Sequence, residues 1–385
     1  MVIFVGYLPV RRNNNRRMKY IMDHSITDKD GKIYWVDVCK GIGILFVVLG
    51  HIAGGYAGAG IFPEYTRVLV TGANFAYVFH MTLLFILSGY LFYRSYAVEG
   101  EQPGNVHYAR KLMNFAWIFI LHSIAWWAIK QVFADSVNIR LTIKDLAWFL
   151  IRPIDPYWYL WVLFFYYLIF YYIGKRGFRN KWVWAAVIAA SLAGSVFWLH
   201  WEAFRRLLLY MFPFYLGMYL SKQDSVKKLE KWVWILCGMI SMAAFSFIIY
   251  TGKDVNAMRV IGIVSGVSIS LFIILLAAHI PFLENSRILR WCGRYSLEIY
   301  VFHNYITAAN RVILFRLGIT GFYINIAVNF LMAVIIPICV GIILRKTGLY
   351  PFFFNPGALY KRALKKSDSL KKNWAFFSVG IIIEV

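Results

Sequence analysis

Three ionisable side chains, Asp37, Lys40 and His51, interrupt an apolar stretch of membrane-spanning length, WVDVCKGIGILFVVLGHI, which runs from Trp35 to Ile52. On an α-helix, which turns about 100° per residue, the step from Lys40 to His51 returns to within about 20° of the same face. At about 1.5 Å of rise per residue, His51 lies about 16 Å deeper than Lys40, near the middle of a ~30 Å hydrocarbon layer. An ionisable group at that depth indicates a functional site, and histidine is suited to proton transfer near neutral pH.

A purely structural interpretation of this stripe stays open at this point. Lys40 could extend its ammonium group to the lipid headgroups. His51 could be a polar packing residue between helices.

The composition indicates a protein that crosses a membrane several times. Of the 385 residues, 61% are hydrophobic and 15% are charged, and the mean hydropathy is +0.60, which is too apolar for a water-soluble domain of this length. The net charge of +23 does not indicate nucleic-acid binding, because the basic residues form short clusters between apolar spans. The cysteines occur singly, so we expect neither disulfides nor a metal site; they are Cys39, Cys237, Cys292 and Cys339.

The hydrophobic runs predict an all-α membrane bundle of about ten transmembrane helices. The sixth run contains Pro213 and is the least regular. The expected spans are 35–52, 74–93, 112–132, 157–174, 182–199, 204–220, 232–251, 258–279, 296–314 and 321–344.

The lysines and arginines set the expected topology. Most of them lie on alternate loops and on both tails, which predicts that both termini are cytoplasmic. We therefore expect a basic cytosolic tail over 1–34, a transmembrane domain over 35–344, and a basic cytosolic or interfacial tail over 345–385. The last residues, NWAFFSVGIIIEV, are too short to span and are expected at the membrane interface.

The second predicted span, FAYVFHMTLLFILSGYLFY, carries His80 near its outer end and Ser88 and Tyr90 in its inner half. On adjacent antiparallel helices His80 and His51 can lie at similar depth and line one cavity. Ser88 or Tyr90 could donate a hydrogen bond to a developing oxyanion. Ser88 with Gly89 is also the pattern that close helix packing favours, so a structural role stays open.

Basic residues follow this span on the predicted cytosolic side. Arg94, His107, Arg110 and Lys111 form a cationic rim where an anionic ligand could dock. For any single one of them, the positive-inside rule is a sufficient explanation.

The ninth predicted span begins GRYSLEIYVFHNY and places Glu298 and His303 inside the membrane. A buried glutamate is costly unless it is paired. We expect Glu298 to pair with a cation such as Arg294 or to line a wet cavity.

Four segments together resemble a known family. VDVCKGIGILFVVLGH, FHMTLLFILSGYLF, YWYLWVLF and YSLEIYVFHN occur in this order, as in the type-3 membrane acyltransferases, especially the branch of fucose 4-O-acetylase-like sugar O-acetyltransferases. The resemblance extends from Trp35 to about Leu344. Its most specific part is a basic residue followed, after ten residues, by Gly-His at the end of the first helix, here Lys40 to His51.

The resemblance implies transfer of an acyl group, usually acetyl from cytosolic acetyl-CoA, to a hydroxyl of an extracytoplasmic or lipid-linked glycan. It also implies about ten transmembrane helices, a bacterial cytoplasmic membrane, and a catalytic role for the residue at His51. Some members have Arg at the position of Lys40. Members with a fused esterase-like domain complete the transfer outside the membrane, so we expect acceptor handling here within the membrane domain or by a glycan-assembly partner.

These considerations define the predicted site. The catalytic set is His51 as general base with His80, Ser88 and Tyr90, and no metal is expected. Acyl-CoA, acting as donor substrate, is expected to bind at the cationic end; this set comprises Lys40, Arg110, Lys111 and Asp37, with Asp37 pairing with Lys40 or with a neighbouring helix.

Two other classes of function remain open from the sequence. A multi-helix transporter or lipid flippase could use His51, His80 and Glu298 as a proton relay. A non-catalytic membrane scaffold in a glycan-assembly complex is less compatible with Lys40 and His51 in one helix.

Overall fold

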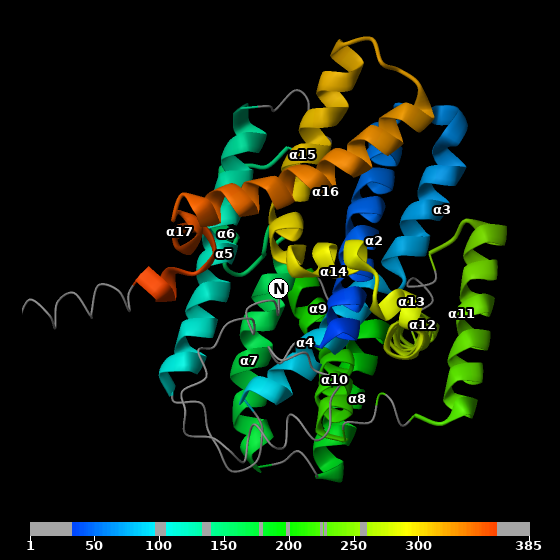
Figure 1. Ribbon diagram of the computed structural model, residues 1–385, viewed down its shortest axis with the longest axis vertical. Coiled ribbons are helices and arrows are strands. Elements are labelled where there is room, and N and C mark those ends of the chain that lie inside the picture. The colour runs from blue at the N-terminus through cyan, green and yellow to red at the C-terminus, as the bar shows by residue number, and fades with distance from the viewer. Residues whose placement is uncertain are drawn as a thin grey trace, which may run out of the picture.

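The computed structural model describes residues 33–96, 105–132, 140–176, 180–197, 201–223, 226, 229–254 and 260–359. The predicted N-terminal tail and most of the predicted C-terminal tail, including the interfacial segment from Asn373 to Val385, lie outside the described residues. Within the described ranges the regular elements are helices (Figure 1). This confirms the all-α class expected from the hydropathy pattern.

Among the described residues, a helix or a pair of helices overlaps each of the predicted spans, and two of these units are broken. The units are α2 (Tyr34–Ala59), α3 (Thr66–Tyr77) with α4 (His80–Tyr96), α5 (Asn105–Val132), α7 (Trp158–Arg176), α8 (Lys181–Val196), α9 (Glu202–Leu209) with α10 (Met211–Gln223), α11 (Lys231–Thr251), α12 (Val260–His279), α15 (Ser296–Arg316) and α16 (Phe322–Lys346). Short elements connect them: η2 (Pro63–Tyr65), α6 (Ile143–Trp148), α13 (Pro281–Glu284), α14 (Arg287–Arg294) and α17 (Tyr350–Phe354).

Six of the described segments are long and apolar enough to cross a membrane, and the count of ten crossings stays a prediction. These six are Tyr34–Ala59, Pro63–Ser95, Tyr108–Val132, Lys231–Thr251, Val260–His279 and Phe322–Lys346. Helix α7 and helix α8 are apolar but shorter. The protein is therefore an integral membrane protein with an α-helical bundle.

Helix α2 lies at the centre of the bundle and positions the predicted site. It contacts α3, α4, α12, α14, α15 and α16 (Figure 1). It is longer than the predicted span of 35–52 and ends at Gly60, whose φ of 63° is the left-handed conformation that glycine adopts readily. Because neighbours surround α2, its polar stripe faces protein rather than lipid.

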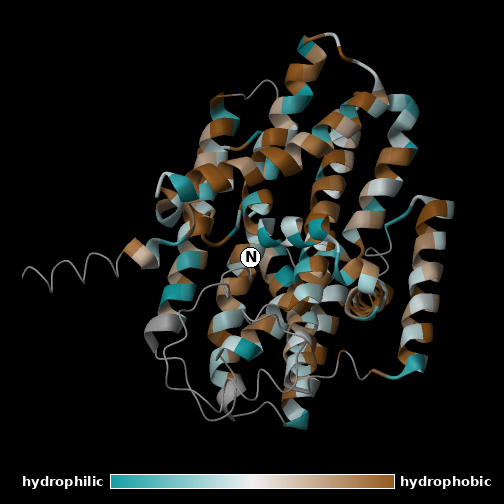
Figure 2. Cartoon of the chain, viewed as in Figure 1, coloured by the Kyte–Doolittle hydropathy of each residue, from teal (hydrophilic) through white to brown (hydrophobic). Residues whose placement is uncertain are grey.

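The outer helices present apolar side chains to the surroundings. On α11 the exposed residues include Leu236, Met239, Met242 and Ile249. Figure 2 shows apolar residues along α11 and α16 and hydrophilic residues gathered around α14. Exposed apolar side chains along helices of this length are what a hydrocarbon environment requires.

The second predicted span, 74–93, is two helices in the structure, with the break at Val78 and Phe79. At the break the carbonyl oxygen of Ala76 lies 3.5 Å from the backbone nitrogen of Phe79 and 2.7 Å from Nδ1 of His80. His303 makes the same contact with a carbonyl four residues earlier inside the unbroken α15. The contact therefore orients the ring of His80 and does not by itself explain the break.

The sixth predicted span, 204–220, is also broken, at Tyr210. Pro213 has no backbone N–H, and its ring clashes with the carbonyl four residues earlier, at Leu209. Helix α9 therefore ends at Leu209 and α10 restarts at Met211. The sequence identified the proline as an irregularity without locating the break.

Two glycines allow α4 and α10 to touch through their backbones. A Cβ atom on Gly89 would lie 1.8 Å from the carbonyl oxygen of Phe214, and one on Gly217 would lie 1.9 Å from that of Ile86. The packing role considered for Gly89 is therefore observed, with Gly217 as its counterpart on the partner helix. Small residues at such crossings are the usual means of close helix association in membranes.

We predict that Gly89→Val or Gly217→Val lowers the melting temperature in detergent by several degrees, since overpacking a tight contact costs about 1–3 kcal/mol or more. The control is Gly72→Ala in α3, where an added Cβ meets nothing within 4 Å. Thermal unfolding followed by gel filtration measures the effect. Equal melting temperatures for all three variants would contradict the predicted contact.

Candidate active site

At one end of the polar stripe, Lys40 and Asp37 form an ion pair. Their Nζ and Oδ1 atoms are 2.6 Å apart, and Lys40 is only 6% exposed. The guanidinium of Arg294 lies farther away, with its Nε 3.8 Å from Oδ2 of Asp37. The expected pairing of Asp37 with Lys40 is confirmed, and Lys40 does not extend to the surface.

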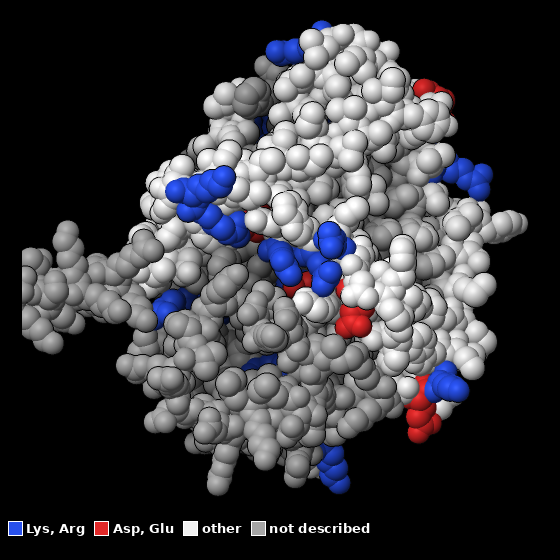
Figure 3. Space-filling view, in the orientation of Figure 1, with Lys and Arg blue, Asp and Glu red and all other residues white. Residues whose placement is uncertain are grey.

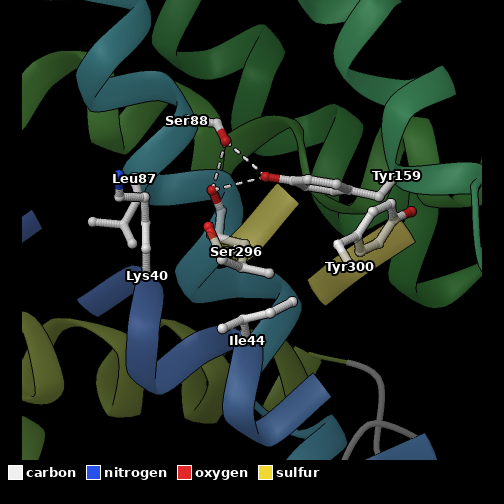
Figure 4. Close-up of a pocket in the computed structure, with 8 residues that line it drawn as sticks. Lys40, Ile44, Leu87, Ser88, Tyr159, Ser296 and Tyr300 are labelled. Carbon is white, nitrogen blue, oxygen red and sulfur yellow. Dashed lines mark hydrogen bonds between the residues drawn. The ribbon is translucent and has the colours of Figure 1, made fainter. Parts of the chain in front are cut away.

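A small cavity lies beside Lys40, between α2, α4, α7 and α15 (Figure 4). Its volume is about 20 Å³, which is room for about one water molecule, so a thioester could enter only if the lining moved apart. It is lined by Lys40, Ile44, Leu84, Leu87, Ser88, Tyr159, Ser296 and Tyr300.

Ser88 is part of a short hydrogen-bond chain in this cavity. Its Oγ lies 2.7 Å from the carbonyl oxygen of Leu84 and 2.7 Å from the hydroxyl of Tyr159. The hydroxyl of Tyr159 also lies 3.2 Å from the carbonyl oxygen of Leu84, so either hydroxyl can donate in the bond between Ser88 and Tyr159. The predicted use of Ser88 as an oxyanion donor would therefore require its single proton to leave its present acceptor.

Tyr90 lies away from this cavity, although it is only two residues from Ser88. Side chains two apart on a helix point in nearly opposite directions. The ring of Tyr90 packs edge-on against Trp35 at 5.0 Å, and Arg94 donates a long hydrogen bond of 3.4 Å to its hydroxyl. The structure does not bring Tyr90 to His51, and the oxyanion role predicted for it gains no support from this position.

Two histidines meet at the other end of the stripe. The ring centroids of His51 and His303 are 5.1 Å apart. The Nδ1 atom of His303 lies 2.9 Å from the carbonyl oxygen of Ile299 and 2.8 Å from that of Tyr300. Carbonyls only accept hydrogen bonds, so we assign the proton to Nδ1, which leaves Nε2 as an acceptor. That Nε2 atom is buried and has no hydrogen-bond partner among the described residues.

His80 is near the pair but is separated from it by Tyr77. The ring centroid of Tyr77 is 6.2 Å from that of His51 and 5.5 Å from that of His80, and its hydroxyl donates to the carbonyl of Gly50 at 2.8 Å. His51 and His80 thus both face the ring of Tyr77, and the expectation that they line one cavity stays a prediction. His303 is the nearer partner of His51, and the only sequence signal for it was a histidine inside the ninth span.

Opposing charges border the histidines on the side of α9. Arg206 donates to Oδ1 of Asp155 at 2.7 Å and to Oε1 of Glu202 at 2.8 Å, and its guanidinium lies 4.6 Å from the ring centroid of Trp158. The charges of Asp155 and Arg206 both act on His51. Partial burial raises the pKa of the Glu202 carboxyl, but the hydrogen bonds from Arg205 and Arg206 have the larger combined effect. The pKa of this carboxyl is therefore lowered.

The predicted cationic rim is only partly assembled. Lys111 is close enough to Lys40 for their charges to repel, and its ammonium lies 5.1 Å from the ring centroid of Phe115. Arg110 packs instead against Gly357, where a Cβ would lie 2.1 Å from its Cγ. The side chain of His107 lies outside the described residues.

Glu298 pairs with a cation, as expected, but that cation is Arg345 and not Arg294. Glu298 is fully buried, and its Oε1 binds the guanidinium of Arg345 and, at 3.1 Å, the hydroxyl of Tyr350. Glu298 and Arg294 are four residues apart, but the chain changes helix at Tyr295, so they do not share a helix face. This break directs Arg294 to Asp37.

The chain was compared with known proteins. Residues 33–346 match a family model described as an acyltransferase domain, that of the type-3 acyltransferases. The chain belongs to this family. A search of curated proteins and a search of solved structures found no match. This membrane acyltransferase therefore carries its matched domain from just before α2 to the end of α16.

We predict that Asp37→Ala destabilises the acyltransferase by about 3 kcal/mol, because removing one partner leaves a buried ammonium group unpaired. The double variant Asp37→Leu with Lys40→Met should recover most of that loss. Unfolding in detergent, measured for both variants, checks the coupling. If the single variant unfolds like the wild type, the pair carries no such energy.

Proposed function

We propose that this protein is an integral membrane O-acyltransferase that moves an acyl group, acetyl in the first instance, from cytosolic acyl-CoA to a hydroxyl of an extracytoplasmic or lipid-linked glycan. One observation carries the proposal: a single helix, α2, holds an ion-paired lysine beside a cavity and, about 16 Å farther along, a histidine that meets a second histidine on α15. Acyl-CoA is a substrate here, and no metal is required.

On the donor side, the phosphates of CoA would meet Lys40 and Lys111. Both are cations near the cavity, and charge-assisted bonds to phosphate are strong. The uncharged pantetheine arm would then follow the line of Ser88, Tyr159 and Ser296 toward the histidines.

At the histidines, the acceptor hydroxyl oxygen would attack the thioester carbonyl carbon while its proton passes to His51. The resulting tetrahedral intermediate expels the CoA thiolate, which takes the proton from His51. The C–S bond breaks, the new ester C–O bond forms, and free CoA returns to the cytosol. No charge or water needs to cross the membrane.

His303 would hold His51 in the required tautomer. Its Nε2 is an acceptor without a partner among the described residues, and its ring centroid is 5.1 Å from that of His51. A small rotation of either ring would let Nε2 receive the N–H of His51 that is not used in catalysis. The other nitrogen of His51 then acts as the base. In other histidine-based sites a carboxylate or a carbonyl takes the orienting role that His303 would have here.

On the acceptor side, Trp158, Arg206 and Asp155 surround the approach to His51. With both termini in the cytosol, this side is extracytoplasmic. An aromatic face beside ion-paired hydrogen-bonding groups suits a sugar ring, which has apolar C–H faces and hydroxyl edges. The expected location is a bacterial cytoplasmic membrane, with glycan-assembly proteins as possible partners.

The family assignment favours acyl transfer over the transporter or flippase considered from the sequence. The two also differ in a simple assay. Acetyl-CoA should raise the melting temperature of the purified enzyme in detergent, because a ligand that binds only the folded state stabilises it. A proton-coupled transporter has no such site.

We predict that His51→Ala lowers acyl transfer by about 100-fold or more, the usual contribution of a general base, without lowering expression. Mass spectrometry of the host's surface glycans, comparing wild type, a deletion strain and His51→Ala at equal expression, would detect loss of acetyl units. His279→Ala, a histidine at the end of α12, is the control and should retain them. Glycans that change only in the deletion strain would exclude His51 as the base.

We predict that Arg206→Ala lowers transfer to the glycan about tenfold, because a charged hydrogen-bonding group on the acceptor side is lost. Stabilisation by acetyl-CoA should change much less than transfer, since Arg206 is not among the residues that line the cavity of Lys40. Lys144→Ala in α6 removes an exposed charge from the same side and should have no effect. A loss of acetyl-CoA stabilisation in Arg206→Ala would contradict its placement on the acceptor side.

A further inference from the structure

Helix α14 is a short amphipathic helix that packs across the start of α2. Its buried residues are Cys292 and Gly293. Arg287, Arg290 and Arg294 follow one another at intervals of three and four, so they share the opposite face. The function proposed above does not use any of these three arginines.

The contact between α14 and α2 is a contact of backbones. A Cβ on Gly293 would lie 1.8 Å from the carbonyl oxygen of Asp37, and one on Gly41 would lie 2.1 Å from that of Leu289. Two glycines, one on each helix, are thus needed for this approach. If the arginines of α14 served only to set the membrane topology, the helix would not need this close backbone contact with α2.

This contact places two arginines at the mouth of the Lys40 site. Arg294 shares Asp37 with Lys40, but at 3.8 Å it is beyond hydrogen-bond distance from that carboxylate. The guanidinium of Arg290 lies over the ring of Tyr34, 4.4 Å from its centroid, and donates to the carbonyl of Asn285. Both guanidinium groups therefore keep N–H donors available for an anion.

Basic side chains gather at this part of the surface. Figure 3 shows blue side chains over α14 and near the C-terminal end of α16, with red acidic side chains beside those over α14. On the other flank of α14, Ile288 is 75% exposed and Trp291 is 51% exposed. An apolar flank beside a basic one is typical of a helix that lies in the membrane interface.

We propose that Arg290 and Arg294 bind phosphate groups of the nucleotide portion of CoA, and that α14 is the cytosolic dock from which the pantetheine arm enters beside Lys40. The inference rests on the acyl-CoA-dependent function proposed above and names binding residues for it. Arginine suits the role because its planar fork binds phosphate oxygens in pairs.

The shared carboxylate of Asp37 supports this assignment. Arg294 lies 3.8 Å from one of its oxygens, and Lys40, which lines the cavity, lies 2.6 Å from the other. A phosphate held by Arg294 would thus lie close to the Lys40 side of the cavity. The predicted rim of Arg110 and Lys111 lies on α5, and α14 adds cations on the side of Asp37.

Phosphates of anionic lipids have the same chemistry and are the other possible source of ligand. The two sources can be separated by placing the purified protein in nanodiscs of phosphatidylcholine alone, which present no net anionic headgroup. CoA, 3′-dephospho-CoA and adenosine 3′,5′-bisphosphate are then titrated, and the dissociation constants are measured by calorimetry. The same titrations are repeated with phosphatidylglycerol present.

In neutral nanodiscs, Arg290→Ala combined with Arg294→Ala should weaken CoA binding about tenfold or more, because two charge-assisted contacts are lost. The preference for CoA over 3′-dephospho-CoA should shrink, and adenosine 3′,5′-bisphosphate should lose affinity in parallel. Arg294→Lys, which keeps the charge without the fork, should be intermediate. Lys346→Ala removes an exposed cation at the end of α16 and should change binding by less than about twofold.

Unchanged CoA affinity in the arginine variants, with a wild type that binds CoA, would overturn the dock and leave the proposed function standing. A change in affinity seen only when phosphatidylglycerol is present would assign the arginines to lipid headgroups and would also overturn it. A wild type that binds no CoA would refute the acyl-CoA-dependent function itself. Melting temperatures of each variant verify that the loss is not caused by unfolding.

Discussion

The ion pair between Lys40 and Asp37 is the interaction on which the arrangement of the site depends. A lysine that is 6% exposed in an apolar bundle is tolerated only with a partner, because an unpaired charge there costs several kcal/mol. Asp37 supplies the partner from the same helix. The same residue also meets α14, since the backbone carbonyl oxygen of Asp37 is the atom against which Gly293 packs.

From that point, polar groups continue through the bundle to His51. Each is held by the backbone of a neighbouring turn: Ser88 by Leu84, and His303 by Ile299 and Tyr300. Backbone carbonyl oxygens three or four residues earlier in the same helix thus orient these two side chains. This is how an apolar bundle can hold reactive groups in fixed orientations without a soluble domain.

Aromatic residues make the remaining scaffold. Tyr157 donates to the carbonyl of Val301, and Tyr300 donates to that of Pro156, so α15 and the start of α7 are bonded reciprocally. The same segment carries Asp155 and Trp158, which meet Arg206 from α9. The segment with Asp155 and Trp158, which borders the histidines, is therefore hydrogen-bonded to α15, the helix that carries His303.

The sequence by itself determined the all-α membrane class, the stripe of Asp37, Lys40 and His51, and the family, because hydropathy, helical period and ordered motifs are local properties of the chain. Only the tertiary structure decided the partners: His303 for His51, Arg345 for Glu298, and Arg294 for Asp37. It also separated Tyr90 from Ser88 and showed the break after Tyr77. These outcomes depend on where one helix ends and which face the next presents, and small backbone contacts such as Gly41 and Gly293 set both.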